Sequence, residues 1–338
     1  KFDWGDWANA FFIPKSCMLK YNGTVDYYLN ENDETKKVDG TASDVGNSSY
    51  GGNAMMEWGQ LWWKLVPDAN GNGTNFYIAD AQVDNTYHAY NNVDCNGKIN
   101  KHFYTPKYFG SNISSKLRSI SGASNSVSIT AQQEIDLAKA NNQDTNNPIW
   151  YTEVYADRLL INLLLVMMAK NMNTQAVYGT GRCASSNSDA IGNGTMNGKG
   201  MFWGSQDQTS GVKVFGMENW WGNIWRRVAG YMNINNVIYT KLTYDTSDGS
   251  TVKGYNLTGD GYVASMYKKY GKIISPMGCR AFLSPWYERG GMEPADENDV
   301  PRFVGRFNIG VVSLHLPMIL AKSRQESKDF FEVLDYYL

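Results

Sequence analysis

Residues 211–226 read GVKVFGMENWWGNIWR, the densest motif of this 338-residue chain. Three tryptophans fall within six residues, with a glycine and an asparagine between the second and the third. Indole rings bury large apolar areas, a glycine allows a tight turn, and polar side chains can bond the backbone that a turn exposes. The motif therefore predicts a tight turn set into a large apolar cluster. Its structural members are expected to be Glu218, Asn219, Trp220, Trp221, Gly222, Asn223 and Trp225.

The composition predicts a folded protein without a broad charged surface. Hydrophobic residues make up 42% of the chain and the formal net charge is -2, which leaves enough apolar material for a sizeable core. Lys and Arg are scattered, so no surface for nucleic-acid phosphates is expected. The longest apolar run, residues 159–169, is interrupted by Asn162 and is shorter than the roughly 20 residues of a membrane span. We expect a soluble protein that binds neither nucleic acid nor membrane.

The cysteines give no sign of a metal centre or a disulfide framework. Cys17, Cys95, Cys183 and Cys279 lie far apart and form no Cys-x-x-Cys pair. We expect reduced thiols, no metal site and no bound cofactor. No signal peptide is evident in the residues that follow Lys1.

Residues 1–125 are expected to form a β-rich, turn-rich region. In residues 17–29, two short apolar runs flank the dipeptide that begins at Asn22, and Asn-Gly readily adopts the type I′ turn of a β-hairpin. Residues 58–79 repeat this pattern around a loop rich in Asn and Gly. That loop resembles a calcium loop, but its twelfth position is Ala79 where a bidentate Glu is needed, so a hairpin turn is favoured.

Residues 126–272 are expected to contain the helices and the Trp-rich motif. A short amphipathic helix is predicted over residues 130–140 and a longer main helix over residues 152–171. The apolar residues of the main helix recur every three or four positions, which indicates a core-facing stripe. Asp157 and Arg158 near its start fit either an exposed pair or an internal anchor. The stripe consists of Leu159, Leu160, Leu163, Leu164, Met167 and Met168.

The Trp-rich motif resembles a known family signature. Residues 216–225 fit Gly-x-Glu-Asn-x-x-Gly-Asn-x-Trp, a pattern of C-type-lectin-like domains of the formylglycine-generating-enzyme type. That family includes variable receptor-binding proteins of phages. The resemblance implies a lectin-like fold used in surface recognition, and it fixes no ligand-binding residues. In that family the ligand face is formed largely by the last fifty or so residues, and the sequence changes character at about residue 270, before such a segment.

The resemblance extends over most of residues 1–270. Several further stretches look like phage and prophage tail-associated proteins of gut bacteria. They are WGDWANA at 4–10, MLKYNGTVDY at 18–27, DGTASD at 39–44, SKLRSISG at 115–122, ADRLLIN at 156–162 and GMFWG at 200–204. The resemblance implies a cell-surface carbohydrate or protein receptor as the partner and a virion tail or prophage-encoded location. Proteins of this kind are commonly trimeric, although no heptad pattern shows a trimer here.

The C-terminal part resembles a different family. Residues 277–283, MGCRAFL, and residues 305–317, GRFNIGVVSLHLP, look like the finger-loop strand and the next barrel strand of anaerobic (class III) ribonucleoside-triphosphate reductase. By this resemblance Cys279 would host a thiyl radical that removes hydrogen from the substrate ribose, and Asn308 would hydrogen-bond near the ribose hydroxyls. The alternative for Cys279 is an inert, partly buried thiol.

The resemblance does not imply activity for this chain. That family also requires a glycyl radical, a cysteine-bound zinc beside it, the remaining barrel strands and a second active-site cysteine, and none of these is recognisable here. We expect residues 273–338 to be a partial β/α-barrel fragment without turnover of its own. The junction near residues 270–277 is either a natural fusion or an artefact of sequence assembly.

Together these patterns favour an α+β fold with short antiparallel strands and one or two helices. The expected function is surface recognition by a tail-associated or adhesin-like protein, and the alternative is an anaerobic ribonucleoside-triphosphate reductase that uses a Cys279 radical. The sequence does not name the ligand. Exposed aromatic rings could stack on sugars, although core or turn packing is the more common role of such residues. The residues considered for stacking are Tyr87, Tyr90, Trp203 and Tyr239.

Overall fold

A computed structural model gives the fold of the chain in two compact units, Lys1–Tyr262 and Val263–Leu338. The first unit contains the Trp-rich motif and all the helices of the described chain. The structure describes residues 2–69, 73–184, 190–234, 237–242, 256–257, 275–277, 281–283, 285–287, 289, 295–299 and 301–303.

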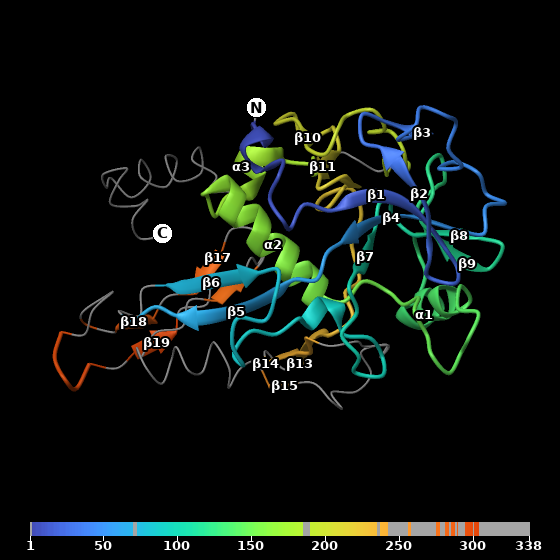
Figure 1. Ribbon diagram of the computed structural model, residues 1–338. Helices are drawn as coiled ribbons and strands as arrows, with labels where there is room; N and C mark the ends of the chain where they lie inside the picture. Colours follow the sequence, from blue (N-terminus) through green and yellow to red (C-terminus); the bar gives the residue numbers. More distant parts are fainter. Residues whose placement is uncertain are drawn as a thin grey trace, which may run out of the picture. The chain divides into compact units, whose positions relative to one another are not determined.

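The largest sheet of the first unit has five antiparallel strands in the order β3-β2-β1-β4-β7 (Figure 1). All seven residues of β4 are buried, so this strand lies inside the unit. Cys17 of β1 lies opposite Tyr28 of β2 and Met55 of β4. The strands are β1 (Lys15–Lys20), β2 (Val25–Asn30), β3 (Asp33–Lys37), β4 (Gly52–Trp58) and β7 (Phe103–Pro106).

The other strands of the first unit form small antiparallel sheets. The β5–β6 and β8–β9 hairpins are two-stranded, whereas β10–β12 and β13–β15 form three-stranded sheets. The hairpin expected around residue 70 is confirmed as β5–β6, although Trp58 belongs to β4 instead. These strands are β5 (Trp62–Pro67), β6 (Thr74–Ala79), β8 (Ser111–Ile113), β9 (Lys116–Arg118), β10 (Trp203–Gly204), β11 (Val212–Val214), β12 (Met217–Glu218), β13 (Tyr231–Ile234), β14 (Val237–Thr240) and β15 (Asn256–Leu257).

In the described part of the chain, three α-helices and two short 3-10 helices accompany the strands, so there are more α-helices than the one or two that the sequence predicted. The short expected helix is confirmed as α1 (Ala131–Lys139), which begins after a capping box between Thr130 and Gln133. The main helix is confirmed as α2 (Tyr155–Ala169), which ends at Lys170 in the left-handed conformation. Its fully buried face also includes Ile161 and Leu165, whereas three of the expected stripe residues are only partly buried. The remaining helices are α3 (Thr174–Tyr178), η1 (Gly5–Trp7) and η2 (Tyr90–Asn92).

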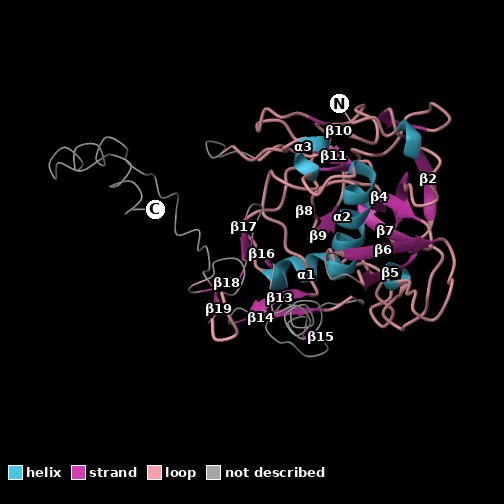
Figure 2. Cartoon of the chain, turned by 90° about the vertical axis from the view of Figure 1, so that its left-hand side faces the viewer, coloured by secondary structure: helices cyan, strands magenta, loops and turns pink. Residues whose placement is uncertain are grey.

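The main hydrophobic core joins elements that are distant in sequence. Trp58 of β4, Leu160 and Leu164 of α2, Val212 of β11 and Trp220 belong to one buried cluster. Figure 2 shows α2 beside β4 and β7 within this unit. The sequence therefore folds into the mixed architecture that its patterns predicted, with the Trp-rich motif in the core.

In the second unit the described residues form two antiparallel pairs of strands. β16 (Ser275–Met277) pairs with β17 (Ala281–Leu283), and β18 (Pro285–Tyr287) pairs with β19 (Pro301–Phe303). Cys279 and Asn308 lie outside the described residues, so the expected barrel geometry around them stays a prediction. No helix within the described ranges is long and apolar enough to span a membrane.

Candidate functional site

The Trp-rich motif forms a buried turn with an unusual backbone. Five of its residues have positive φ angles, at Phe215, Gly216, Asn219, Gly222 and Asn223. Non-glycine residues adopt such angles where surrounding contacts hold them, and Asn does so more readily than most. Phe215 and Asn219 are fully buried. The motif is therefore a fixed structural turn of the first unit.

Glu218 and Asn223 of the motif bond the backbone around them, whereas the buried side-chain amide of Asn219 has no hydrogen-bond partner among the described residues. The Glu218 carboxylate accepts hydrogen bonds from the backbone N–H groups of Gly194 (2.8 Å) and Met196 (3.0 Å). The Asn223 side chain exchanges two hydrogen bonds with the backbone of Ile191, at 2.7 and 3.0 Å. Ile191, Gly194 and Met196 lie outside the helices and strands, so the hydrogen bonds from the motif hold this loop in place.

The three tryptophans of the motif differ in exposure. Trp220 is buried and donates from Nε1 to Asn162 of α2 at 2.8 Å. Trp221 is partly buried and donates to the Gly179 carbonyl at 2.9 Å. Trp225 is fully exposed, with 101% relative accessibility. Only Trp225 is thus placed to contact a partner in solution.

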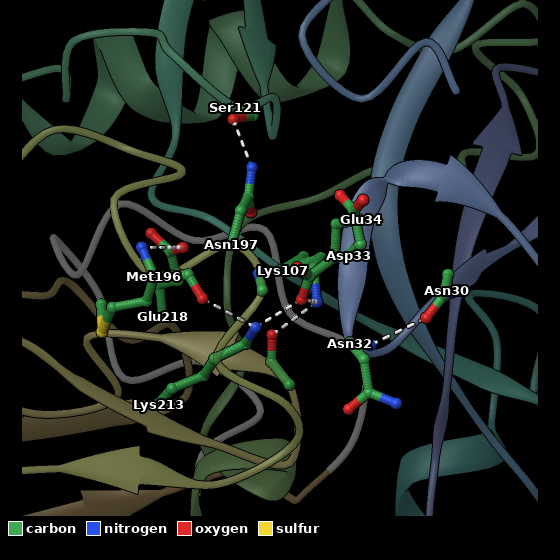
Figure 3. Close-up of polar contacts among 12 residues, drawn as sticks. Asn30, Asn32, Asp33, Glu34, Lys107, Ser121, Met196, Asn197, Lys213 and Glu218 are labelled. Carbon is green, nitrogen blue, oxygen red and sulfur yellow. Dashed lines mark hydrogen bonds and ion pairs between the residues drawn. The ribbon is translucent and has the colours of Figure 1, made fainter. Parts of the chain in front are cut away.

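A buried cluster of charges, Glu34, Lys107, Lys213 and Glu218, brings together three distant segments of the first unit (Figure 3). Lys213 and Glu218 lie opposite each other on the neighbouring strands β11 and β12. The Glu34 carboxylate forms an ion pair with Lys107 at 3.0 Å and another with Lys213, and it accepts the Gly198 N–H at 2.7 Å. The two lysines also donate to backbone carbonyls of Gly216 and Met196. All four charged residues are buried, so this cluster holds segments of the first unit together and is not exposed to a ligand.

The pKa values of this charge cluster follow from burial and from mutual attraction. Burial raises the pKa of Glu34, but the charges of Lys107 and Lys213 outweigh burial and leave it below its usual value. Burial and the neighbouring Lys213 lower the pKa of Lys107 to about 8. This cluster could not be predicted from the sequence, because Glu34 is distant in the chain from its partners and lies 179 residues from Lys213.

A cavity of about 500 Å³ lies in the first unit beside the Trp-rich motif. Its wall includes residues of β7, residues of α1 and the segment that leads into α2. Buried Trp220 and exposed Trp225 both contribute to the lining, so the motif connects the cavity to the surface. Concave cavities with aromatic side chains are the usual form of a ligand site, and this cavity also has many polar side chains in its lining. The other aromatic lining residues are Phe103, Tyr104, Tyr108, Phe109, Trp150 and Tyr151.

Charged side chains on the cavity wall are mostly paired. Glu153 forms ion pairs with Arg158 (3.4 Å) and Arg226 (2.9 Å). The Arg158 and Arg226 guanidinium groups also lie over aromatic rings, at 3.9 Å from Trp220 and 4.0 Å from Phe109. These contacts make one wall of the cavity rigid.

Asp157, left open between an exposed pair and an internal anchor, is a buried side chain of α2 on the cavity wall. It is 6% exposed, and its carboxylate accepts a hydrogen bond from Asn91 Nδ2 at 2.8 Å. Burial raises its pKa to about 7, Asn91 opposes the shift, and the charge of Glu153 adds to it. Arg158 pairs with Glu153 instead of Asp157. Sequence reasoning did not single out Asp157 as a site residue, because its environment comes from segments far away in the chain.

The residues first considered for sugar stacking do not line this cavity. Tyr87 is buried in a cluster with Trp62 and Ala89, and Tyr90 packs against Trp63 with 5.0 Å between ring centres. In the described parts of the chain, no group of three His, Cys, Asp or Glu side chains is arranged to hold a metal ion. Cys17 is buried, and burial raises the pKa of its thiol well above the usual value.

Comparisons with known proteins match the C-terminal part of the chain. The profile of the family "Anaerobic ribonucleoside-triphosphate reductase" matches residues 239–338, a match that begins before the expected boundary at residue 273. The enzyme of that name from Escherichia coli (strain K12) is 37% identical over 68 residues, which are 20% of this chain and 8% of the relative. The Haemophilus influenzae enzyme is 46% identical over 68 residues, with the same coverage.

The enzyme of that name from Enterobacteria phage T4 is 48% identical over 50 residues, which are 15% of this chain and 7% of the relative. The chain therefore spans less than a tenth of the length of these relatives. No solved structure matches the chain. The C-terminal segment is thus similar to a part of anaerobic ribonucleoside-triphosphate reductases, whereas the lectin-like resemblance of the preceding residues stays a prediction.

Proposed function

We propose that the first unit is a lectin-like recognition domain of a tail-associated or adhesin-like protein, and that it binds a cell-surface carbohydrate or protein receptor. The observation that carries this proposal is the aromatic-lined cavity of about 500 Å³ with Trp225 exposed at the Trp-rich motif. A fully exposed indole gains free energy when a partner covers it, and Trp is enriched among residues that dominate binding. Rigid cavity walls reduce the entropy lost on binding.

The proposal is tested by measuring binding of the purified chain to bacterial cells and to a glycan array. We expect Trp225→Ala to weaken binding by about tenfold or more, because exposed aromatic anchors contribute roughly 2 kcal/mol at interfaces. Tyr77→Ala is the matched control, since Tyr77 is also an exposed aromatic residue but lies on β6 and does not line the cavity. Equal loss with both variants, or no binding to any cell or glycan, would contradict the proposal.

Two further parts of this proposal concern assembly and location. The lectin-like reading implies a homotrimer in a virion tail or a prophage-encoded particle. Light scattering of the purified chain would give three times the monomer mass if the trimer forms. A monomer mass at all concentrations would contradict the proposed trimer but would not contradict the recognition function.

A second candidate function is favoured by the family match to residues 239–338. The comparisons support this candidate more directly than the first, since they contain no tail-associated or lectin-like protein. In it, the chain belongs to an anaerobic ribonucleoside-triphosphate reductase in which Cys279 carries a thiyl radical and Asn308 lies near the ribose. We propose that this chain alone has no such turnover, because it corresponds to less than a tenth of the relatives.

An activity assay separates the two candidates. The chain is incubated under anaerobic conditions with ribonucleoside triphosphates, a reductant and the activating partner of a related reductase, and deoxyribonucleotide is measured. No product is expected. Product that disappears in Cys279→Ala, but not in the control Cys183→Ala, would establish the second candidate and overturn the expected inactivity.

A further inference from the structure

Asp157 is a buried acid whose environment lacks a cation. Its carboxylate accepts one hydrogen bond, from Asn91, and among the described residues no Lys, Arg or His nitrogen lies within ion-pair distance of it. Asn91 cannot turn its amide around without loss, because its Oδ1 accepts the Trp63 Nε1–H at 2.9 Å. A buried carboxylate with a single neutral partner is costly, so the site favours either protonation or a cationic ligand.

The other acids of the cavity differ from Asp157 in this respect. Glu153 pairs with two arginines, and Glu134 of α1 pairs with Arg227 at 2.6 Å. Their negative charges are therefore balanced within the protein. Asp94 also lines the cavity, and its carboxylate accepts hydrogen bonds from the backbone N–H groups of Asn96 and Lys98 and from Asn100 Nδ2. Asp157 is therefore left as the buried acid on the cavity wall that an incoming cation can neutralise.

Aromatic residues of the cavity lining suit a cation. Phe103 and Tyr104 of β7 and the adjacent Trp150 and Tyr151 line the cavity together with Asp157. The faces of aromatic rings attract ammonium groups, and this attraction is strongest where water is excluded. An amine can also donate hydrogen bonds to the free carboxylate oxygen, which a neutral hydroxyl satisfies less strongly.

We propose that the cavity binds its ligand through a protonated primary amine that pairs with Asp157. This inference rests on the proposed recognition function and specifies the chemistry of the ligand. An amino sugar and a lysine side chain both carry such a group. The aromatic rings pack against the carbon skeleton beside the amine, and the ion pair of the amine with Asp157 orients the ligand.

Proton linkage gives this proposal a distinctive signature. Amine binding requires the carboxylate form of Asp157, and its raised pKa of about 7 means that this form is lost in mildly acidic solution. A lysine amine stays protonated throughout, with an ordinary pKa of about 10.4. Affinity for a lysine amine is therefore expected to be roughly 30-fold weaker at about pH 5.5 than at about pH 8. The other titratable or charged groups facing the cavity are Asp94, Lys101, His102, Tyr104, Tyr108, Arg118, Glu134, Tyr151, Glu153, Arg226 and Arg227.

The test uses the full chain and small probes followed by NMR titration. Nα-acetyl-lysinamide is compared with Nα-acetyl-norleucinamide, which lacks the amine, and glucosamine is compared with glucose. We expect the amine of at least one pair to improve binding by tenfold or more, and the pair that responds identifies the source of the amine. Asp157→Asn should abolish the amine preference and the pH dependence, while its unfolding midpoint at about pH 5.5 stays close to wild type.

His88→Gln is the control, because His88 is an ionisable side chain that does not line the cavity. It should leave the amine preference and its pH dependence intact. Equal binding with and without the amine, no binding of any amine probe, or an unchanged preference in Asp157→Asn would overturn the inference. Retained binding of Asp157→Asn to cells or glycans would then show that the recognition function stands while the amine contact does not.

Discussion

Glu34 is the residue through which β3, β11 and the segment after β7 are held together by charge. Glu34→Gln removes the negative charge between Lys107 and Lys213 and leaves two cations in an environment that excludes water. Removing one partner of a buried ion pair costs about 3–5 kcal/mol. We expect the free energy of unfolding to fall by about this amount, measured by urea denaturation at neutral pH.

The control for this prediction is Lys36→Met on the same strand. Lys36 is exposed and pairs with Asp33 at 3.3 Å, and exposed pairs contribute about 0–1 kcal/mol. A Glu34→Gln variant as stable as this control would mean that the two lysines are neutral in the folded protein. The charge cluster would then be a set of neutral hydrogen bonds.

Asp157 gives a prediction about the pH dependence of stability. Its pKa is raised from 3.8 to about 7 on folding, so between these values the folded protein holds more protons than the unfolded chain. Stability contributed by this group is therefore present at low pH and lost as the pH rises toward 7, by at most about 1.4 kcal/mol per pH unit. The measurement is the free energy of unfolding of wild type minus that of Asp157→Asn across this range. A difference that does not decrease with pH would contradict the raised pKa.

Residues of the motif at 211–226 could be anticipated from the sequence, whereas the cavity residues could not. Tryptophans, a glycine and polar side chains close together are a local signal for a buried turn, and Glu218 and Asn223 indeed bond neighbouring backbone. Glu34 and Asp157 carry no local signal. Their electrostatic environment comes from partners that are distant in sequence and meet only in the folded chain. A local sequence pattern therefore cannot predict it.

At the scale of elements, the contact of β1 with β4 depends on a glycine. A Cβ atom at Gly52 would lie 2.0 Å from the Leu19 carbonyl oxygen, which belongs to the backbone and cannot rotate away. Gly52→Ala must therefore separate the two strands, at an expected cost of about 3 kcal/mol or more. Gly51→Ala is the control, because nothing lies within 4 Å of its Cβ position. Urea denaturation compares the two, and equal stabilities would mean that the strand contact is looser than described.

The elements themselves were largely predictable, and their partners were not. Periodicity located α2 and the Asn-Gly turn located the β1–β2 hairpin, because both signals are local. The place of β4 between β1 and β7 has no local signal, since strand order depends on contacts between distant segments. For the same reason the sequence placed Trp58 in the wrong hairpin.

At the scale of the whole molecule, the boundary between the two compact units differs from the start of the family match. The compact units divide after residue 262, whereas the similarity to anaerobic ribonucleoside-triphosphate reductases begins at residue 239. The sequence predicted a change of character near residues 270–277, where the reductase-like motif at residues 277–283 begins. Amplification across this region from the source genome tests whether the two parts are joined naturally, and failure to recover the joined product would make the join an assembly artefact.

The division into units predicts that the first one is stable alone. A chain that ends at Tyr262 keeps the five-stranded sheet, α2, the charge cluster and the Trp-rich motif, so its own core remains complete. Domains with a complete core generally fold independently. We expect its thermal unfolding to be cooperative, with a midpoint within a few degrees of that of the full chain, followed by circular dichroism. A control chain that ends at residue 210 lacks Val212, Val214 and Trp220 of the core cluster and should not fold. If the 262-residue chain also fails to fold, the first unit is not an independent domain. The C-terminal residues would then be needed for its stability.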